Sequence, residues 1–248
     1  MTRWKNRVAL VTGASSGIGR AIAEDLAELG MKLVLAARRE DRLKALRAEL
    51  ASKTEVLPVR VDLRDEGSID ALFETVRATW GGVDVLINNA GLGRNAPLTS
   101  GSTEAWREML EVNVLGLCVC TREAVKDMRA RGDDGHVVHI ASMASHRVPP
   151  NSGVYSATKY AVRSLTEGLR QELRALGSSI RITAISPGFV ETEFAEVYWG
   201  DEDRAKETYS QFRVLDAKDV ASAVTYVLDA PPHMQVHDML IRPTDQRS

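Results

Sequence analysis

Short runs of apolar and β-branched residues alternate with amphipathic stretches along nearly the whole chain. Strands buried on both faces are predicted at residues 7–11, 32–36, 56–61, 83–87, 136–140 and 180–185. Helices are predicted between and after them, at residues 17–29, 41–51, 66–80, 102–131, 154–176 and 216–228, before a last strand at 238–241. This alternation predicts an α/β fold, a parallel sheet covered by helices on both faces. No linker, repeat or low-complexity segment interrupts it, so we expect a single domain over residues 1–248.

Composition argues against several classes of protein. The 248 residues carry a net charge of −2 and no basic block, which argues against a nucleic-acid partner. No stretch approaches the ~18 consecutive apolar residues of a membrane span, and the N-terminal apolar run is too short for a secretory signal. We therefore expect a cytoplasmic protein with no membrane partner. Cys118 and Cys120 face different ways on a helix, and His233 and His237 lack an acidic ligand set, so no disulfide and no metal site are predicted.

Tyr155 and Lys159 lie four residues apart in a predicted helix, and therefore on one face of it. A lysine ammonium favours the phenolate, so it is expected to lower the pKa of the tyrosine from about 10 toward neutrality. Such a pair can act as a general acid and base near pH ~7. Any helix can carry a tyrosine and a lysine at this spacing, so the pair needs support from the rest of the chain.

The first predicted strand leads into a turn with glycines at Gly13, Gly17 and Gly19, and then into a helix. Glycines let backbone N–H groups approach a pyrophosphate, and the start of a helix favours negative charge. The turn lacks the Gly-Lys-Ser/Thr ending of a P-loop, which argues against an ATPase or GTPase. The sequence therefore predicts a dinucleotide site here, although a glycine turn can also be a plain connection.

Arg38 and Arg39 follow the second predicted strand. An acidic residue at this place would accept a hydrogen bond from a ribose 2′-hydroxyl and repel a 2′-phosphate. Two guanidiniums would instead bind the phosphate, at ~1.5–3 kcal/mol for each charge-assisted hydrogen bond. We therefore expect NADP(H) to be preferred over NAD(H). The alternative is a solvated basic start to the next helix, since Arg42, Lys44 and Arg47 follow.

Six motifs occur in order along the chain: Thr12-Gly13-x-x-x-Gly17-x-Gly19, Asn88-Asn89-Ala90-Gly91, Asn113, Ser142, Tyr155-x-x-x-Lys159 and Pro187-Gly188-x-x-x-Thr192. With them the chain resembles the short-chain dehydrogenase/reductase family over nearly its whole length. The resemblance implies a Rossmann-like, doubly wound sheet of about seven parallel strands in the order 3-2-1-4-5-6-7, with ligands beyond the C-terminal ends of the strands.

The resemblance also implies the catalytic roles. Tyr155 would give a proton to the carbonyl oxygen in reduction, or remove it from the alcohol in oxidation, while Ser142 hydrogen-bonds that oxygen. Lys159 would bind the nicotinamide ribose and lower the pKa of Tyr155. Asn113 would keep a kinked helix and an ordered water that links Lys159 to solvent.

Cofactor contacts to NADP(H) follow from the same resemblance. They are Gly13, Ser15, Ser16, Gly17, Ile18 and Gly19 in the glycine turn, Arg38 and Arg39 at the 2′-phosphate, Asp62 and Leu63 at the adenine, Asn89, Ala90 and Gly91 at the ribose, Tyr155 and Lys159, and Pro187, Gly188, Val190 and Thr192 on the nicotinamide side.

Several runs are similar to an NADP-using subgroup with insect farnesol dehydrogenases and a vertebrate reductase of ketosteroids and dicarbonyls. These runs are 88–92, 100–103, 120–124, 142–143, 146–148, 155–162 and 165–173. Bacterial serine and 3-hydroxy acid dehydrogenases share the Arg-Arg pair and a proline-containing tail. The glycine turn departs from this pattern. Many NADP-using relatives carry a basic residue in it, whereas this chain has Ser15 and Ser16 there.

The segment 191–213 lies where the family places a lid over the substrate. It holds Phe194, Tyr198, Trp199, Tyr209 and Phe212, and Leu92, Met143, Val148 and Phe189 are also expected to face the cleft. An apolar or mixed substrate is predicted, such as a terpenoid alcohol, a steroid or a dicarbonyl. Alternatively, the aromatics only pack the lid onto the body, and Arg94 or Arg147 clamps a carboxylate, as a 3-hydroxy acid or serine dehydrogenase would require.

The sequence thus predicts an NADP(H)-dependent enzyme that interconverts a ketone or aldehyde and its alcohol. The alternative from another class is a non-catalytic regulatory protein that senses NADP; family members of that kind usually lose the tyrosine or the lysine. The resemblance further implies a homodimer or homotetramer that pairs the helices 102–131 and 154–176.

Overall fold

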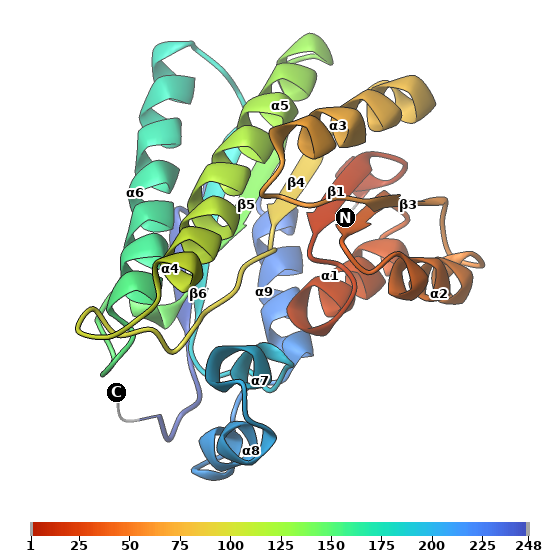
Figure 1. Ribbon diagram of the computed structural model, residues 1–248. Helices are drawn as coiled ribbons and strands as arrows, with labels where there is room; N and C mark the ends of the chain where they lie inside the picture. The colour runs from red at the N-terminus through yellow and green to blue at the C-terminus, as the bar shows by residue number, and fades with distance from the viewer. Residues whose placement is uncertain (1, 247–248) are drawn as a thin grey trace.

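The computed structural model describes residues 2–246 and contains one sheet of seven parallel strands (Figure 1). The strands are β1 Val8–Thr12, β2 Lys32–Ala37, β3 Val56–Arg60, β4 Val85–Asn88, β5 His136–Ile140, β6 Arg181–Pro187 and β7 Asp238–Ile241. Their order is β3-β2-β1-β4-β5-β6-β7, and every neighbouring pair is parallel. The predicted fold class is confirmed.

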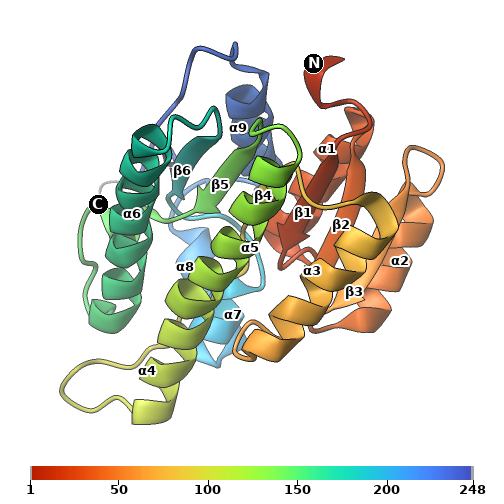
Figure 2. The ribbon, with the colours of Figure 1, turned by 90° about the horizontal axis from the view of Figure 1, so that it is seen from above.

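Helices cover both faces of the sheet (Figure 2). One face carries α1 Gly17–Glu28, α2 Glu40–Leu50 and α9 Ala217–Asp229. The other face carries α3 Glu66–Trp80, α5 Leu117–Ala130 and α6 Gly153–Ala175. Within β1, Ala9 and Val11 pack toward the first layer while Val8 and Leu10 pack toward the second. Because both faces are covered, the strands are mostly apolar on both faces, and buried polar residues such as His136 and His139 are hydrogen-bonded to threonine hydroxyls.

The stretch predicted as one helix over 102–131 is divided into three parts. Helix α4 Thr103–Leu110 leads into a π-helical segment at Glu111–Gly116, which continues into α5. Asn113 lies in this π-helical segment. Such segments are rare and occur frequently at functional sites.

Pro187 was expected to lie beyond the sixth strand, and that prediction is wrong. It is the last residue of β6 and pairs in register with Ile241 of β7. A proline can occupy this place because the strand ends here, and the next N–H, that of Gly188, donates to the Ile241 carbonyl at 2.7 Å.

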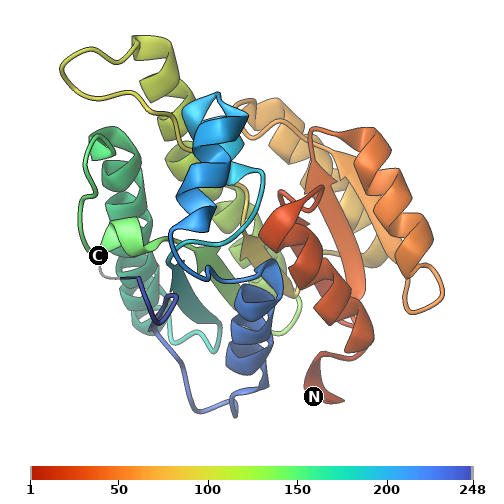
Figure 3. The same ribbon diagram turned by 90° about the horizontal axis from the view of Figure 1, so that it is seen from below.

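Two short helices lie beyond the C-terminal ends of the strands. They are α7 Phe194–Trp199 and α8 Glu202–Ser210, within the predicted lid segment 191–213. Viewed from below, these helices (blue) lie in front of the strands (Figure 3). An isolated bridge between Val190 and Leu215 closes the base of this segment. Among residues 2–246, no helix is both long enough and apolar enough to cross a bilayer.

Candidate functional site

A cavity of about 630 Å³ opens at the C-terminal ends of the strands, between the sheet and the lid segment. Its wall includes almost every residue predicted for catalysis and cofactor binding: Gly13, Ser15, Ser16, Gly17, Ile18, Arg38, Arg39, Asp62, Leu63, Asn89, Ala90, Gly91, Ser142, Tyr155, Lys159, Pro187, Gly188, Val190 and Thr192. Gly19 and Asn113 are the two predicted residues that do not line it.

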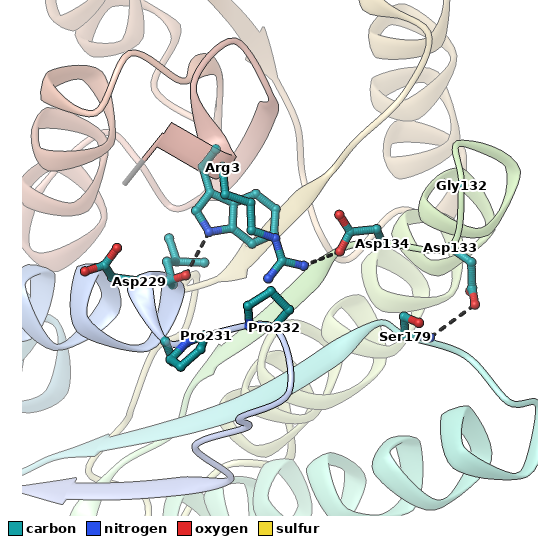
Figure 4. A pocket seen from close by; sticks show the side chains of 11 residues that line it. Arg3, Gly132, Asp133, Asp134, Ser179, Asp229, Pro231 and Pro232 are labelled. Atoms are coloured by element: carbon teal, nitrogen blue, oxygen red, sulfur yellow. Dashed lines mark hydrogen bonds and ion pairs between the residues drawn. The ribbon is translucent and has the colours of Figure 1, made fainter.

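A second pocket lies at the opposite end of the sheet, beside the segments that lead into β1, β5, β6 and β7 (Figure 4). Arg3 pairs there with Asp134, and a carboxylate oxygen of Asp133 accepts a hydrogen bond from the Ser179 N–H at 3.1 Å. None of the predicted site residues lines this pocket. The cavity at the C-terminal strand ends is therefore the candidate site.

The glycine turn is packed tightly against the end of β4. Gly13 and Gly17 have φ values of +68° and +52°, in the left-handed region that favours glycine. A Cβ atom on Gly19 would lie 2.4 Å from both Asn89 Nδ2 and the Gly13 carbonyl oxygen. The absence of a side chain at Gly19 therefore serves this packing, which explains why the residue lies behind the cavity wall.

Thr12, which the glycine motif names but to which no role was assigned, joins the turn to β4. Its hydroxyl accepts hydrogen bonds from the N–H groups of Asn89 at 3.1 Å and Ala90 at 3.0 Å. The Asn89 side-chain amide in turn donates to the Thr12 carbonyl at 2.9 Å. The only signal in the sequence was a hydroxyl residue at the end of a buried strand.

Arg39 is held between the glycine turn and the lid segment. Its guanidinium donates to the hydroxyls of Ser15, at 3.1 and 3.2 Å, and of Ser16, at 2.6 Å. The two serines that replace a basic residue in the turn thus position the arginine. Its remaining terminal nitrogen donates to the Glu193 carboxylate at 2.7 Å, and Glu193 also pairs with Arg42. Neither Glu193 nor Arg42 was predicted, because nothing in the sequence pairs positions so far apart.

Asp62, at the end of β3, is paired with Arg64 through hydrogen bonds of 2.6–3.2 Å. The Arg64 guanidinium lowers the pKa of Asp62 to about 2, so the carboxylate is charged at neutral pH. Its neighbour Leu63 is buried, and both residues line the cavity.

Ser142 follows β5 and caps a short 3₁₀-helix, Met143–Ser145. Its hydroxyl oxygen accepts a hydrogen bond from the Ala144 N–H at 3.0 Å, which leaves the hydroxyl proton available as a donor. Tyr155 and Lys159 both lie near the start of α6. The Lys159 ammonium is 6.0 Å from the centre of the Tyr155 ring and donates to the Ile140 carbonyl, at the end of β5, at 3.0 Å.

Burial determines the acidity of both groups. It raises the pKa of Tyr155 to about 12, against a lowering hydrogen bond from Ser142. It also lowers the pKa of Lys159 to about 8. The expected shift of the Tyr155 pKa toward neutrality is therefore absent in the protein's own groups, because the loss of solvation dominates; that Lys159 lowers this pKa beside a bound cofactor stays a prediction.

Asn113 supports the wall of the cavity from behind. Its amide nitrogen donates to the Leu92 carbonyl at 2.8 Å and to the Thr158 hydroxyl at 3.0 Å, while its oxygen accepts from the Leu92 N–H at 2.9 Å. The π-helical segment thereby fixes the loop after β4 against the start of α6. The predicted water link from Asn113 to Lys159 stays a prediction.

Aromatic side chains of the lid cover Tyr155. Its ring centre lies 5.4 Å from that of Phe194 and 6.4 Å from that of Tyr198. Gly93 makes this approach feasible, since a Cβ there would lie 2.8 Å from each of the two lid rings. Trp199, Tyr209, Leu92, Met143 and Phe189 line the cavity as predicted.

Two residues predicted to face the cleft do not line it. Val148 is 61% exposed, and Phe212 packs against Phe189 with ring centres 5.9 Å apart. Gln246, from the C-terminal tail, lines the cavity instead, and its side-chain oxygen accepts from the Phe189 N–H at 3.2 Å. The direction of a loop side chain depends on tertiary packing, which the sequence pattern does not encode.

The two arginines considered as carboxylate clamps lie in different surroundings. Arg94 lines the cavity, but its guanidinium pairs with Glu108 at 2.9 Å and donates to the Val197 carbonyl of the lid at 3.0 Å. Arg147 is not part of the cavity wall. The charge of Arg94 is therefore already balanced.

The donors present fit a nicotinamide dinucleotide. The glycine turn and the start of α1 suit a pyrophosphate. Lys159 is buried and has one recorded acceptor within residues 2–246, the Ile140 carbonyl, which leaves N–H groups for ribose hydroxyls. Tyr155 and Ser142 line the same cavity and lie within hydrogen-bonding reach of each other.

Comparison with known proteins agrees with this geometry. Residues 7–203 match the family model described as short chain dehydrogenase. The chain is 52% identical to Dehydrogenase/reductase SDR family member 11 of Gallus gallus and 43% identical to farnesol dehydrogenase of Aedes aegypti, with 100% of each chain covered in both cases. The solved closed form of serine dehydrogenase complexed with NADP+ matches with a TM-score of 0.91 and 33% identity, covering 97% of this chain and 96% of that one.

The buried Lys159 should make stability depend on pH. Below pH ~8 the folded state holds a buried cation, and between pH ~8 and ~10.5 it releases a proton that the unfolded chain keeps, so stability rises with pH. Lys159→Met should therefore raise the free energy of unfolding at pH ~7 by up to about 3 kcal/mol, and the gain should shrink by pH ~9.5. Urea denaturation at several pH values measures this.

Lys206→Met, at an exposed position of α8, is the matched control and should shift stability little at any pH. A Lys159→Met protein that is less stable than the wild type by the same amount at every pH would contradict the expectation.

Proposed function

The chain belongs to the short-chain dehydrogenase family, and we propose that it is an NADP(H)-dependent oxidoreductase that interconverts a ketone or aldehyde and its alcohol. One observation carries the proposal. Ser142, Tyr155 and Lys159 meet in a single cavity whose wall also carries Arg38 and Arg39, which follow β2 and are separated from β5 by β1 and β4.

The proton chemistry falls to Tyr155. When bound, the cofactor supplies or accepts the hydride at the substrate carbon. During reduction the Tyr155 hydroxyl gives its proton to the substrate oxygen, and a pKa raised to about 12 keeps the phenol protonated for that task. The Ser142 hydroxyl donates a second hydrogen bond to the same oxygen, and a preorganised donor of this kind contributes about 3–4 kcal/mol to transition-state stabilisation.

Lys159 positions the reaction. Its ammonium is fixed by the Ile140 carbonyl and lies beside Gly91, where a Cβ would come within 3.3 Å of it. From this place it can bind ribose hydroxyls and hold the cofactor next to Tyr155. In the oxidation direction, its positive charge stabilises the phenolate that must form.

Preference for NADP(H) rests on Arg38 and Arg39. Both line the cavity directly after β2, and they stand where an acidic residue of the chain would accept a hydrogen bond from a ribose 2′-hydroxyl. Arg39 is already oriented by Ser15 and Ser16, so little side-chain freedom is lost when it binds an anion.

An apolar or mixed substrate, such as a terpenoid alcohol, a steroid or a dicarbonyl, fits the aromatic wall formed by Phe194, Tyr198, Trp199 and Tyr209. Similarity to a farnesol dehydrogenase supports this choice. Similarity to a serine dehydrogenase favours a small hydroxy acid as the second candidate. Because Glu108 already pairs with Arg94, the cavity offers no free clamp from that arginine, and we prefer the apolar substrate.

Tyr155→Phe should reduce NADPH-dependent turnover of ketones and dicarbonyls by about 10²–10⁴-fold, since the proton donor is lost. The affinity for NADPH, measured by quenching of tryptophan fluorescence, should change little. Tyr226→Phe, at an exposed position of α9, is the control and should keep full activity. Unchanged turnover in Tyr155→Phe with tight cofactor binding would favour the regulatory, non-catalytic alternative.

Arg38→Asp should weaken NADP(H) binding by about ten- to hundredfold while NAD(H) binding changes little, because only the phosphate contact is lost. Dissociation constants for both cofactors measure the ratio. Arg47→Asp, at an exposed position of α2, controls for the change in net charge. Equal losses for the two cofactors would defeat the phosphate assignment.

We also infer that chains pair through α4–α5 and α6. Leu110 and Leu115 are 50% and 60% exposed on the first of these, and Tyr160 is 41% exposed on the second, which leaves apolar area for a partner. Leu115→Glu should lower the mass measured by sedimentation velocity to that of a smaller assembly. Leu98→Glu makes the same change at an exposed leucine outside these helices and should leave the mass unchanged.

A further inference from the structure

Glu193 links the lid segment to the end of β2. It directly follows Thr192, and its carboxylate lies 2.7 Å from an Arg39 terminal nitrogen while also pairing with Arg42. Arg39, Thr192 and Glu193 itself all line the cavity. An anionic side chain from one side of the cavity thus occupies the cations on the other side.

We propose that Glu193 is a specificity-determining residue: its carboxylate stands in the place of the 2′-phosphate, and NADP(H) must displace it whereas NAD(H) cannot. The inference rests on the proposed function, since it requires that Arg39 belongs to the phosphate site. It adds a competing anion, supplied by the protein itself, to that site.

The hydrogen bonds of Arg39 explain why the two anions compete. One edge of its guanidinium is used by the Ser15 and Ser16 hydroxyls. The other terminal nitrogen is the donor that faces an anion, and Glu193 takes it. Arg38 is exposed, and no hydrogen bond or ion pair is recorded for it within residues 2–246, so it can make the first contact with an incoming phosphate.

The ion pair between Arg39 and Glu193 is weak enough for a ligand to displace. Side chains of Arg39 and Glu193 are each 41% exposed, and ion pairs of this exposure are weak. Burial raises the pKa of Glu193, but the arginines hold it near 2, so the carboxylate stays charged at neutral pH and does not leave by protonation. A phosphate dianion brings more charge to the same guanidiniums and can replace it.

Displacement would also act on the lid. The Thr192 carbonyl, one residue before Glu193, accepts a hydrogen bond from the Tyr209 hydroxyl of α8 at 3.2 Å. Helix α7 begins at the next residue, Phe194, whose ring lies against Tyr155. When the phosphate binds and Glu193 is released, the start of α7 would therefore lose its ion pairs with the arginines that follow β2.

Titration calorimetry with 2′,5′-ADP and 5′-AMP tests the proposal without turnover. Glu193→Gln keeps the side-chain shape and removes the charge, so 2′,5′-ADP should bind about three- to tenfold more tightly, as expected for loss of a weak competing ion pair. Binding of 5′-AMP should not change. Glu196→Gln, an exposed acid in the same segment, controls for net charge and should alter neither ligand.

Hydrogen exchange gives an independent readout of the lid. In the wild-type protein, 2′,5′-ADP should speed amide exchange over residues 194–210, and 5′-AMP should not. Glu193→Gln should show the faster exchange before any ligand is added.

Three results would overturn the inference: unchanged 2′,5′-ADP affinity in Glu193→Gln, weaker affinity, or an equal gain for both ligands. Arg39→Gln separates this failure from failure of the proposed function. If Arg39→Gln weakens 2′,5′-ADP alone while Glu193→Gln does nothing, the phosphate site stands and only the competition is refuted. If Arg39→Gln affects both ligands equally, the phosphate site itself is misplaced.

Discussion

A lysine ammonium buried at the junction of β5 and α6 is the interaction on which the site depends. Lys159 is only 6% exposed, and its charge is accommodated by the Ile140 carbonyl at the last residue of β5. That carbonyl is available because a parallel strand ends there, at the edge where the order of strands brings β1, β4 and β5 together. The fold thus provides a polar site for the ammonium, which a purely apolar core could not stabilise.

Burial of the charged Lys159 also lowers the stability of the fold. Loss of solvation lowers the pKa of Lys159 to about 8 and raises that of Tyr155 to about 12, so at neutral pH the lysine is still charged while the phenol is neutral. The phenol is therefore protonated, as proton donation in the proposed reduction requires, but its raised pKa opposes release of the proton. Formation of the phenolate would require additional positive charge beside it, which an oxidised nicotinamide in the proposed site would carry.

Sequence patterns predicted the strands and the covered parallel sheet because these follow from local rules, whereas the strand order and most of the cavity wall were predicted through the resemblance to the short-chain dehydrogenase/reductase family. Apolar runs between amphipathic stretches define the strands, and a doubly wound sheet then brings the residues that follow each strand to one edge. The helical pattern did not show the π-helical segment around Asn113, where only the resemblance implied a kink, because one extra residue in a turn hardly alters helical periodicity. Contacts of Glu193 and the outward direction of Val148 depend on tertiary packing and leave no periodic signal.

Ser15 and Ser16 connect the two halves of the site. A hydroxyl in the glycine turn cannot neutralise a phosphate, but it can hold an arginine, and the hydroxyls of both serines hold Arg39, which we propose as a ligand of the 2′-phosphate. A guanidinium fixed in this way before its ligand arrives has lost its side-chain entropy in advance, and it attracts whichever anion can reach it. Glu193 is the anion that the chain itself brings within reach. The lid segment therefore contacts the end of β2 because a preorganised cation lies there. A ligand that displaces Glu193 binds Arg39 and also releases the lid segment from this contact.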